Sequence, residues 1–322
     1  MLPYCTANFT LSRAPSGNEA FDSGGLDLSI YLGVLYTLLG FIMIPLAMLV
    51  LSVFNQPLLF KHSCYKLMAL TTVLDIVNLI NGMWISGMFA LLRIHHCSHG
   101  VWVAHYSQFL ALVWYMYSVT SEILAFNRLL EFSNRKLALF LFDGKRTYLW
   151  LLLVFGYPIL CSKLVPDAFY HYNPYIGAYY LFRVNGEPNV VHIINNFFKF
   201  GFITVCYSVM LIQIFVLKRS SQWSPLEIKV SIQLLVIAVL ADGASLGYIA
   251  AAYLPLSPSM AKYASTFGQF LWFFVHGGST IIYIVMNRNV NQRFRKIVST
   301  RLLARNGVVR VSNAVKGIAS VT

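Results

Sequence analysis

Residues 29–53 read SIYLGVLYTLLGFIMIPLAMLVLSV, a run that contains no charged side chain. A helix needs about 20 mostly apolar residues to cross the hydrocarbon core of a bilayer, so this run predicts a membrane-spanning helix. It begins too far along the chain for a cleaved signal peptide, and the preceding segment carries Glu19, Asp22 and Asp27 instead of basic residues. We therefore expect the run to remain in the protein as its first span.

The composition of the whole chain is that of a membrane protein. Of its 322 residues, 58% are hydrophobic and 11% are charged, and the mean hydropathy is +0.65. A soluble domain carries about 25% charged residues and could not hide so much apolar surface. The composition therefore excludes a soluble globular enzyme, a disordered chain and a fibrous repeat protein.

The same length criterion finds seven apolar runs, with no internal repeat and no linker long enough to separate domains. The expected fold is thus an all-α bundle of seven transmembrane helices over residues 29–286. The predicted spans are Ser29–Val53, Leu67–Leu92, Trp102–Leu130, Tyr148–Val165, Val191–Leu217, Val230–Leu254 and Tyr263–Met286.

Lys and Arg residues near the ends of the spans indicate the orientation of the bundle. If the N-terminus is outside, eighteen of the 24 Lys and Arg residues lie in cytoplasmic loops and tail, five lie outside, and Lys199 lies within the fifth span. Cytoplasmic loops carry such an excess. We therefore expect an extracellular segment, 1–28, and a cytoplasmic tail, 287–322. The net charge of +13 then reflects the basic cytoplasmic face, and we expect no nucleic-acid partner.

Both terminal segments carry features that agree with this orientation. A sequon begins at Asn8, on the expected outer side, which makes this residue a candidate for N-glycosylation. In the tail, Val290, Phe294 and Val298 recur at helical spacing among basic residues. This pattern predicts an amphipathic helix that lies on the inner leaflet.

Charged side chains inside a bilayer are costly, and they usually mark function. Asp75 in the second span and Glu122 in the third are predicted to lie at similar depth. Two close carboxylates cannot both stay ionised without a counter-charge, so we hypothesise that they share a proton or hold a small cation such as Na⁺. The alternative is that each is protonated and hydrogen-bonded to a polar neighbour.

A second polar group is predicted in the outer halves of the last three spans. Lys199, Asp242 and His276 lie there, and they are predicted to border a ligand cavity. The alternative roles are an internal ion pair of Lys199 with Asp242 and a core hydrogen bond for His276. The second outer loop is rich in tyrosine, which suits either a pocket mouth, with Tyr179 as a ligand residue, or an interfacial aromatic belt. Its tyrosines are Tyr170, Tyr172, Tyr175, Tyr179 and Tyr180.

Four histidines and one cysteine lie close together in the sequence, near the outer end of the third span. Such spacing could bind Zn²⁺ or Cu²⁺, but solvated histidines are ordinary in exposed loops, so we expect neither a metal nor a cofactor. Cys97 is better explained as half of a disulfide on the oxidising side, with Cys5 as the preferred partner and Cys161 as the alternative. The cluster consists of His95, His96, Cys97, His99 and His105.

Asn127-Arg128, at the inner end of the third span, resembles the Asp-Arg-Tyr motif of rhodopsin-like receptors, with Asn in place of the acid. The resemblance implies a cation that is paired inside the bundle in the inactive state and released toward a G protein in the active state. The alternative is an Arg128 side chain that only anchors the helix end at the headgroups.

An ordered set of short motifs resembles the nematode serpentine receptor class T chemoreceptors. The resemblance implies a chemoreceptor in the plasma membrane of sensory neurons, which binds a small molecule and signals through a heterotrimeric G protein. The alternative is a transporter of a small solute, which usually has inverted repeats. No enzyme is expected. The motifs are Tyr4-Cys5, Cys64-Tyr65-Lys66-Leu67-Met68, Asn127-Arg128, Phe142-Asp143-Gly144-Lys145-Arg146-Thr147, His276-Gly277 and Ile282-Tyr283.

Overall fold

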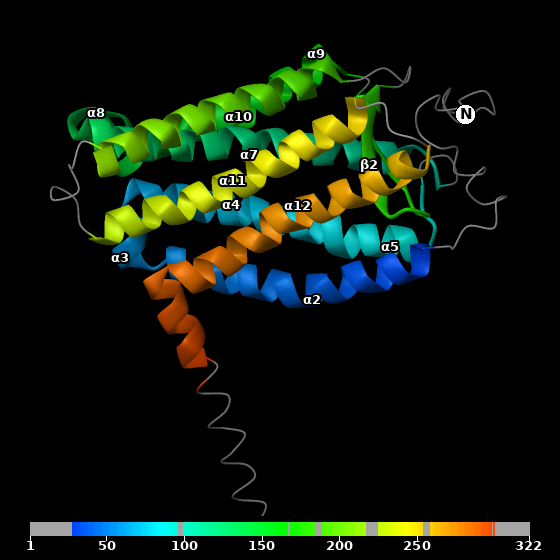
Figure 1. Ribbon diagram of the computed structural model, residues 1–322, viewed down its shortest axis with the longest axis horizontal. Coiled ribbons are helices and arrows are strands. Elements are labelled where there is room, and N and C mark those ends of the chain that lie inside the picture. The colour runs from blue at the N-terminus through cyan, green and yellow to red at the C-terminus, as the bar shows by residue number, and fades with distance from the viewer. Residues whose placement is uncertain are drawn as a thin grey trace, which may run out of the picture.

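The computed structural model describes residues 28–95, 99–166, 168–183, 189–216, 225–253, 258–297 and 299. Within these residues, seven helices are long and apolar enough to cross a membrane, which confirms the predicted bundle. They lie side by side along the long axis of the molecule (Figure 1). Following the predicted orientation, we call the end that carries the two strands the outer end.

The spans extend beyond several of the predicted limits. Two of them begin with proline, at Pro225 and Pro258, before the predicted starts at Val230 and Tyr263. Proline suits the first turn of a helix, where a backbone N–H would have no partner inside the helix. The spans are α2 (Ser29–Phe54), α4 (Ser63–Leu79) with η2 (Ile80–Ile85) and α5 (Ser86–Leu91), α7 (Val101–Ser133), η3 (Gly144–Leu149) with α9 (Trp150–Leu164), α10 (Val190–Leu211) with η4 (Ile212–Val216), α11 (Pro225–Tyr253) and α12 (Pro258–Met286).

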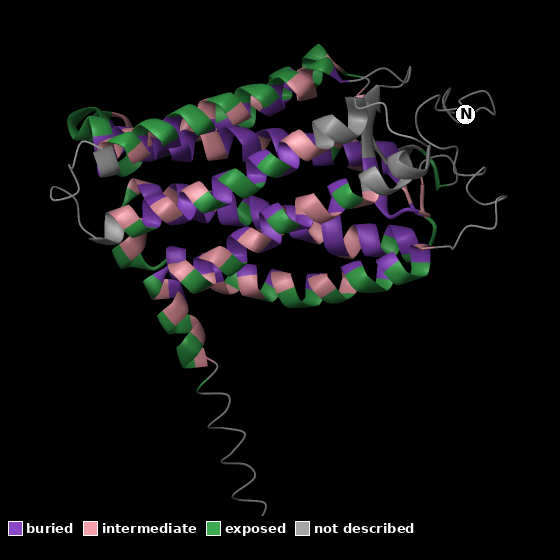
Figure 2. Cartoon of the chain, in the orientation of Figure 1, coloured by how far each residue is buried: buried purple, intermediate pink, exposed green. Residues whose placement is uncertain are grey.

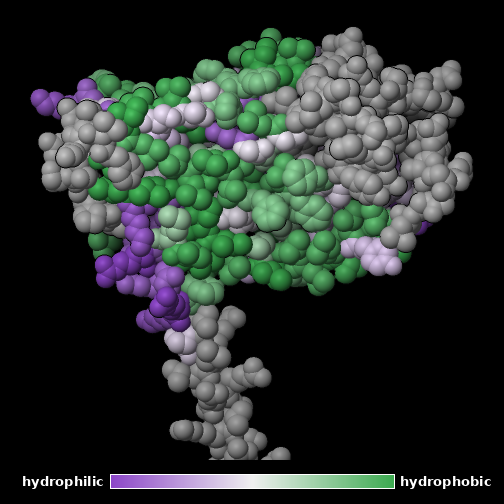
Figure 3. Space-filling view, viewed as in Figure 1, coloured by the Kyte–Doolittle hydropathy of each residue, from purple (hydrophilic) through white to green (hydrophobic). Residues whose placement is uncertain are grey.

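The bundle is apolar both in its core, between the helices, and on the surface that faces away from the core. Buried residues face the neighbouring helices, whereas exposed residues of α9, α10 and α2 face outward (Figure 2). Hydrophobic side chains also cover the visible surface of the spans (Figure 3), as expected where helices contact lipid. Large exposed apolar side chains on α9 and α10 include Leu152, Phe155, Ile159, Phe198 and Val205.

A β-hairpin, which the sequence analysis did not predict, connects the fourth and fifth spans. β1 (Ala168–Asn173) pairs antiparallel with β2 (Ala178–Arg183), and Asn173 lies opposite Ala178 next to the turn. Gly177 has a φ of 59°, a left-handed conformation that glycine adopts without strain. The Asn173 side chain accepts the backbone N–H of Tyr175 at 3.1 Å and so stabilises the turn. The hairpin lies at one end of the bundle (Figure 1).

The predicted helix after the last span is helical over residues 288–297. It turns away from α12 and runs across the direction of the spans (Figure 1). The Asn287 side chain accepts the backbone N–H groups of Asn289 and Val290, which caps the new helix. Val290 is buried, while Arg293 and Arg295 are exposed. Contact with the inner leaflet stays a prediction, and Val298 lies outside the described residues.

Candidate functional site

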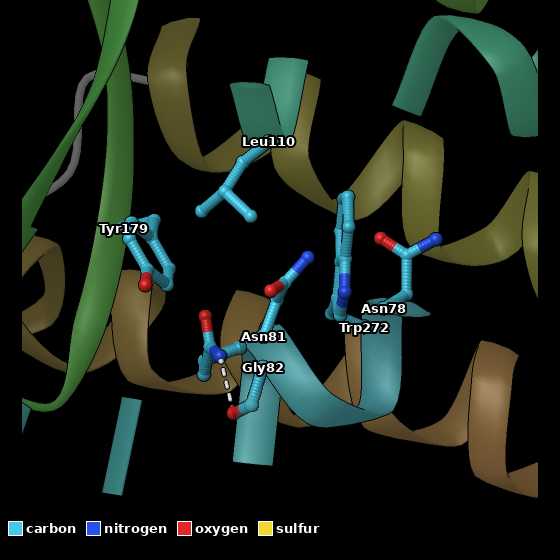
Figure 4. A pocket seen from close by; sticks show the side chains of 7 residues that line it. Asn78, Asn81, Gly82, Leu110, Tyr179 and Trp272 are labelled. Carbon is cyan, nitrogen blue, oxygen red and sulfur yellow. Dashed lines mark hydrogen bonds between the residues drawn. The ribbon is translucent and has the colours of Figure 1, made fainter. Parts of the chain in front are cut away.

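A small cavity lies in the outer half of the bundle, where α4, η2, α7, β2 and α12 meet (Figure 4). Its volume is about 20 Å³, and a water molecule needs about 10–15 Å³ by the same measure. In this conformation the cavity therefore has room for about one water molecule. Its lining residues are Asn78, Asn81, Gly82, Leu110, Tyr179, Gln269 and Trp272.

The π-helical turn η2 directs the second span toward the cavity. In a π-helical turn the backbone hydrogen bonds join residues five apart. Here the Ser86 hydroxyl also donates to the carbonyl of Asn81, five residues earlier, at 2.8 Å. The Gln269 side chain donates to the Gly82 carbonyl at 3.2 Å, the bond drawn in Figure 4. A Cβ atom on Gly82 would lie 3.3 Å from Cδ1 of Trp272, so glycine allows the second and seventh spans to approach closely.

The hairpin closes the cavity from the outer side and is tied to three spans. The Tyr36 hydroxyl donates to the Gly177 carbonyl at 3.0 Å, and the Thr266 hydroxyl donates to the Ile176 carbonyl at 2.8 Å. The Tyr172 hydroxyl donates to the Ser86 carbonyl at 2.6 Å. Tyr179, predicted as a ligand residue, lines the cavity; its contact with a ligand stays a prediction.

Asp75 and His276 form a buried contact at hydrogen-bonding distance between α4 and α12, beneath the cavity. His276 Nδ1 lies 2.7 Å from Oδ1 of Asp75, and both side chains are essentially unexposed. The Ser279 hydroxyl donates to Oδ2 of the same carboxylate at 2.8 Å. This differs from the predicted pairing of Asp75 with Glu122, because depth along a helix does not determine which neighbour a side chain faces.

Lys199 is buried against aromatic rings in the core of the bundle. Its Nζ lies 4.7 Å from the ring centroid of Trp114 and 5.6 Å from that of Tyr117, and it donates to the Ser245 hydroxyl at 3.3 Å. In the described part of the chain it forms no direct salt bridge, although it attracts the carboxylates of Asp242 and Glu122. The internal ion pair of Lys199 with Asp242, the alternative role suggested by the sequence, is thus an attraction without a salt bridge, and Glu122 belongs to the same group.

Aromatic rings connect the cavity with both buried polar groups. Trp272 lines the cavity, and its ring centroid lies 4.7 Å from that of Trp114 and 5.2 Å from that of His276. Tyr117 lies between His276, at 4.7 Å, and Lys199. The predicted residues Lys199 and His276 therefore lie behind the Trp272 ring and do not line the cavity.

Arg128 is the centre of a polar cluster at the inner end of α7. Its side chain forms an ion pair with Glu131 and also donates to Oδ1 of Asn127 at 3.3 Å. Asn127 in turn donates to the Ser63 hydroxyl at 3.2 Å, which ties α7 to α4. Since Arg128 is only 4% exposed, it is not a side chain that reaches out to the headgroups. A pocket of about 300 Å³ opens beside this ion pair.

The family model described as serpentine type 7TM GPCR chemoreceptor Srt matches residues 17–306. The chain belongs to the Srt family. Among solved structures, the crystal structure of squid rhodopsin superposes on this Srt receptor with a TM-score of 0.65 at 12% sequence identity, over 85% of this chain and 86% of that chain. At this identity the likeness concerns the fold alone. No curated protein matches the chain.

The sequence analysis of the Srt receptor missed two residues that complete these sites. Glu131 supplies the acid that Asn127 lacks, and its position three residues after Arg128 on the same helix was the available signal. Asn81 lines the cavity, and its signal was the spacing from Asn78 on a helix with small residues.

Several predicted residues of the Srt receptor lie outside the part that the structure describes. These are Cys5, Asn8, His96 and Cys97. Cys161, the alternative disulfide partner, is a buried free cysteine. Among the described residues, no group of three or more His, Cys, Asp or Glu side chains is placed to hold a metal ion.

Proposed function

We propose that this Srt receptor is a chemosensory receptor of the sensory-neuron plasma membrane that binds an external small molecule in the cavity beneath the hairpin. Ligand binding activates a heterotrimeric G protein at the inner end. The observation that carries the proposal is the position of Trp272, which lines the cavity and also contacts His276 and Trp114.

A ligand can enter only if the cavity grows, because its volume is about 20 Å³. Trp272 is the largest side chain of the lining, so its displacement is the direct way to make room. The ring then presses on His276, whose bond to Asp75 joins the second and seventh spans. A ligand that binds the displaced arrangement more tightly shifts the receptor toward that arrangement.

The inner end of the bundle carries the residues that pass this change on to a G protein. Arg128 and Glu131 are paired beside the open pocket of about 300 Å³. Both residues lie on α7, so a change in the position of the Arg128 side chain that breaks this pair exposes a cation to a partner. The orientation assigned from Lys and Arg residues supports this end as the cytoplasmic one.

Nucleotide exchange on purified heterotrimeric G proteins, with the full-length receptor in lipid nanodiscs, tests the function. A panel of small organic compounds is applied to the wild type, Gly82→Ala and Gly243→Ala. A methyl group at Gly82 narrows the cavity beside Trp272, whereas one at Gly243 meets nothing within 4 Å. We expect active compounds to need about tenfold higher concentration with Gly82→Ala only, a loss of about 1.4 kcal/mol.

Two outcomes would contradict the proposal. One is an equal response of Gly82→Ala and the wild type. The other is receptor-dependent uptake of a labelled compound into vesicles without nucleotide exchange, which is the behaviour of the alternative transporter.

A further inference from the structure

The chemical character of the cavity indicates the class of ligand, and this step rests on the proposed function. Among the residues that the structure describes, the lining has three amide side chains, one phenol, one indole and one aliphatic side chain, and neither a cation nor a carboxylate. Behind the lining, the ammonium group of Lys199 lies against the Trp114 ring and does not reach the cavity. A charged ligand would lose its hydration without gaining a counter-charge.

Asn81 has one hydrogen-bonding group that is free to meet a ligand. Its Oδ1 accepts the Tyr106 hydroxyl at 2.6 Å, which fixes the amide plane. Its Nδ2 is buried without a partner, and the residue is 5% exposed. Figure 4 shows this nitrogen directed into the space between Leu110 and Trp272. A buried donor without a partner is destabilising, so a ligand that places an acceptor there is favoured.

The other two amides of the lining each donate a hydrogen bond to a backbone carbonyl. Asn78 donates to the Leu74 carbonyl at 2.9 Å, and Gln269 donates to the Gly82 carbonyl at 3.2 Å. These bonds hold the backbone of the second span in place. Among the described lining amides, Asn81 is the one whose nitrogen is buried without a hydrogen-bond partner.

We propose that the cavity takes a small uncharged molecule whose carbonyl or hydroxyl oxygen accepts a hydrogen bond from Nδ2 of Asn81. The apolar part of the molecule packs against Leu110 and the Trp272 ring. Asn81 is the specificity-determining residue, because a donor left unpaired by the wrong ligand penalises its binding. Such a ligand is larger than the cavity in this conformation, so its binding also moves Trp272 or the hairpin.

Five-carbon probes test the ligand class with the full-length receptor in nanodiscs. Pentan-2-one, pentan-2-ol, pentanoate and pentylammonium differ mainly in their polar group. Saturation-transfer NMR titrations, with empty nanodiscs as the control for lipid partition, give the dissociation constants. We expect the ketone and the alcohol to bind the wild type at least tenfold more tightly than either ion.

Two substitutions of similar size test the role of Asn81. Asn81→Leu removes the donor and should weaken pentan-2-one binding about tenfold. Asn81→Asp replaces the donor with a carboxylate and retains an acceptor for Tyr106, so it should reverse the preference toward pentylammonium. A thermal unfolding curve identifies a variant that is not folded. The binding data of the other variant then test the role of Asn81.

Three results would overturn the inference: an ion that binds the wild type more tightly than the ketone, equal ketone affinity in the wild type and Asn81→Leu, or no saturable ketone binding. Nucleotide exchange in the same preparation separates this failure from failure of the proposed function. A charged compound that stimulates exchange overturns the ligand class and leaves the receptor function standing. Ketone binding that depends on Asn81 without any exchange supports the class and contradicts the signalling role.

Discussion

Lys199 illustrates how a single charge is accommodated in the interior of this bundle. Its ammonium group lies over the Trp114 and Tyr117 rings, and the negative faces of aromatic rings attract such a cation. Asp242 and Glu122 add attraction without direct contact. One buried cation thus attracts acidic side chains on two different helices, and its removal takes that attraction away.

We therefore expect Lys199→Met to reduce the stability and surface expression of the receptor. Leaving buried charges unpaired costs about 3–5 kcal/mol. Thermal unfolding of the purified variant and surface labelling in cells measure the effect, and Lys163→Met, at an exposed lysine of α9, is the control. Normal surface expression with altered ligand preference would instead place Lys199 in the ligand site.

For single residues, the sequence predicts well which polar side chains are buried in the bundle. It predicts less well which residues they contact. Asp75, Lys199 and His276 are conspicuous because they are polar side chains within apolar spans. Their partners depend on the rotation of each helix about its axis, and the apolar pattern does not determine this rotation in a membrane, since both lipid and core are apolar. This is why His276 was grouped with Lys199 and not with Asp75.

At the scale of elements, the first and second spans pack closely through glycine. A Cβ atom on Gly87 would lie 2.5 Å from Oγ1 of Thr37 and 2.9 Å from the carbonyl oxygen of Gly33. Small residues at a helix crossing let the backbones approach and increase dispersion contacts, which replace the hydrophobic effect as the source of helix association in lipid.

Gly87→Ala should consequently lower the thermal unfolding midpoint, because a backbone carbonyl cannot move away as a side chain can. Overpacking of this kind costs about 1–3 kcal/mol. Gly156→Ala in α9 adds the same methyl group where nothing lies within 4 Å, so it should leave the midpoint unchanged or raise it. Equal midpoints of the two variants would show that α2 and α5 adjust freely.

The sequence predicts the spans well and the irregular elements poorly. Each span has an apolar run of sufficient length, and this signal is strong for helices in membranes. The hairpin has no clear alternation, since residues 168–173 read AFYHYN and carry aromatic side chains on both faces. The π-helical turn within Ile80–Ile85 leaves the length and apolar character of the second span unchanged.

At the scale of the whole molecule, the polar groups form three levels along the bundle. The amide-lined cavity is at the outer end, the Asp75–His276 pair is in the middle, and the Arg128–Glu131 pair is at the inner end. The first two levels are joined by Trp272. A signal between the ends then requires only that a helix carrying two of these levels has two stable positions.

Glu131→Gln should raise the basal rate of nucleotide exchange several-fold in the absence of added compounds. The substitution removes the charge that holds Arg128, and the inactive arrangement loses an interaction that the active one lacks. Basal exchange in nanodiscs at equal receptor concentration is the measurement. Asp143→Asn is the control, because Asp143 lines the same pocket without an ion pair to Arg128 among the described contacts. Basal exchange of Glu131→Gln at the rate of this control would show that the ion pair does not restrain the receptor.

The π-helical turn η2 affects how this chain should be aligned with its relatives. A π-helical turn is what a one-residue insertion produces in an α-helix, and each residue rotates an α-helix by about 100°. An ungapped alignment anchored on Asp75 would therefore misassign the residues beyond Ile85 to a neighbouring helix face. A second span without the π-helical turn would present different side chains to the hairpin, which contacts Ser86 in this structure. A single gained or lost residue in this turn thus changes which side chains the outer part of the second span presents to its neighbours, without rebuilding the rest of the bundle.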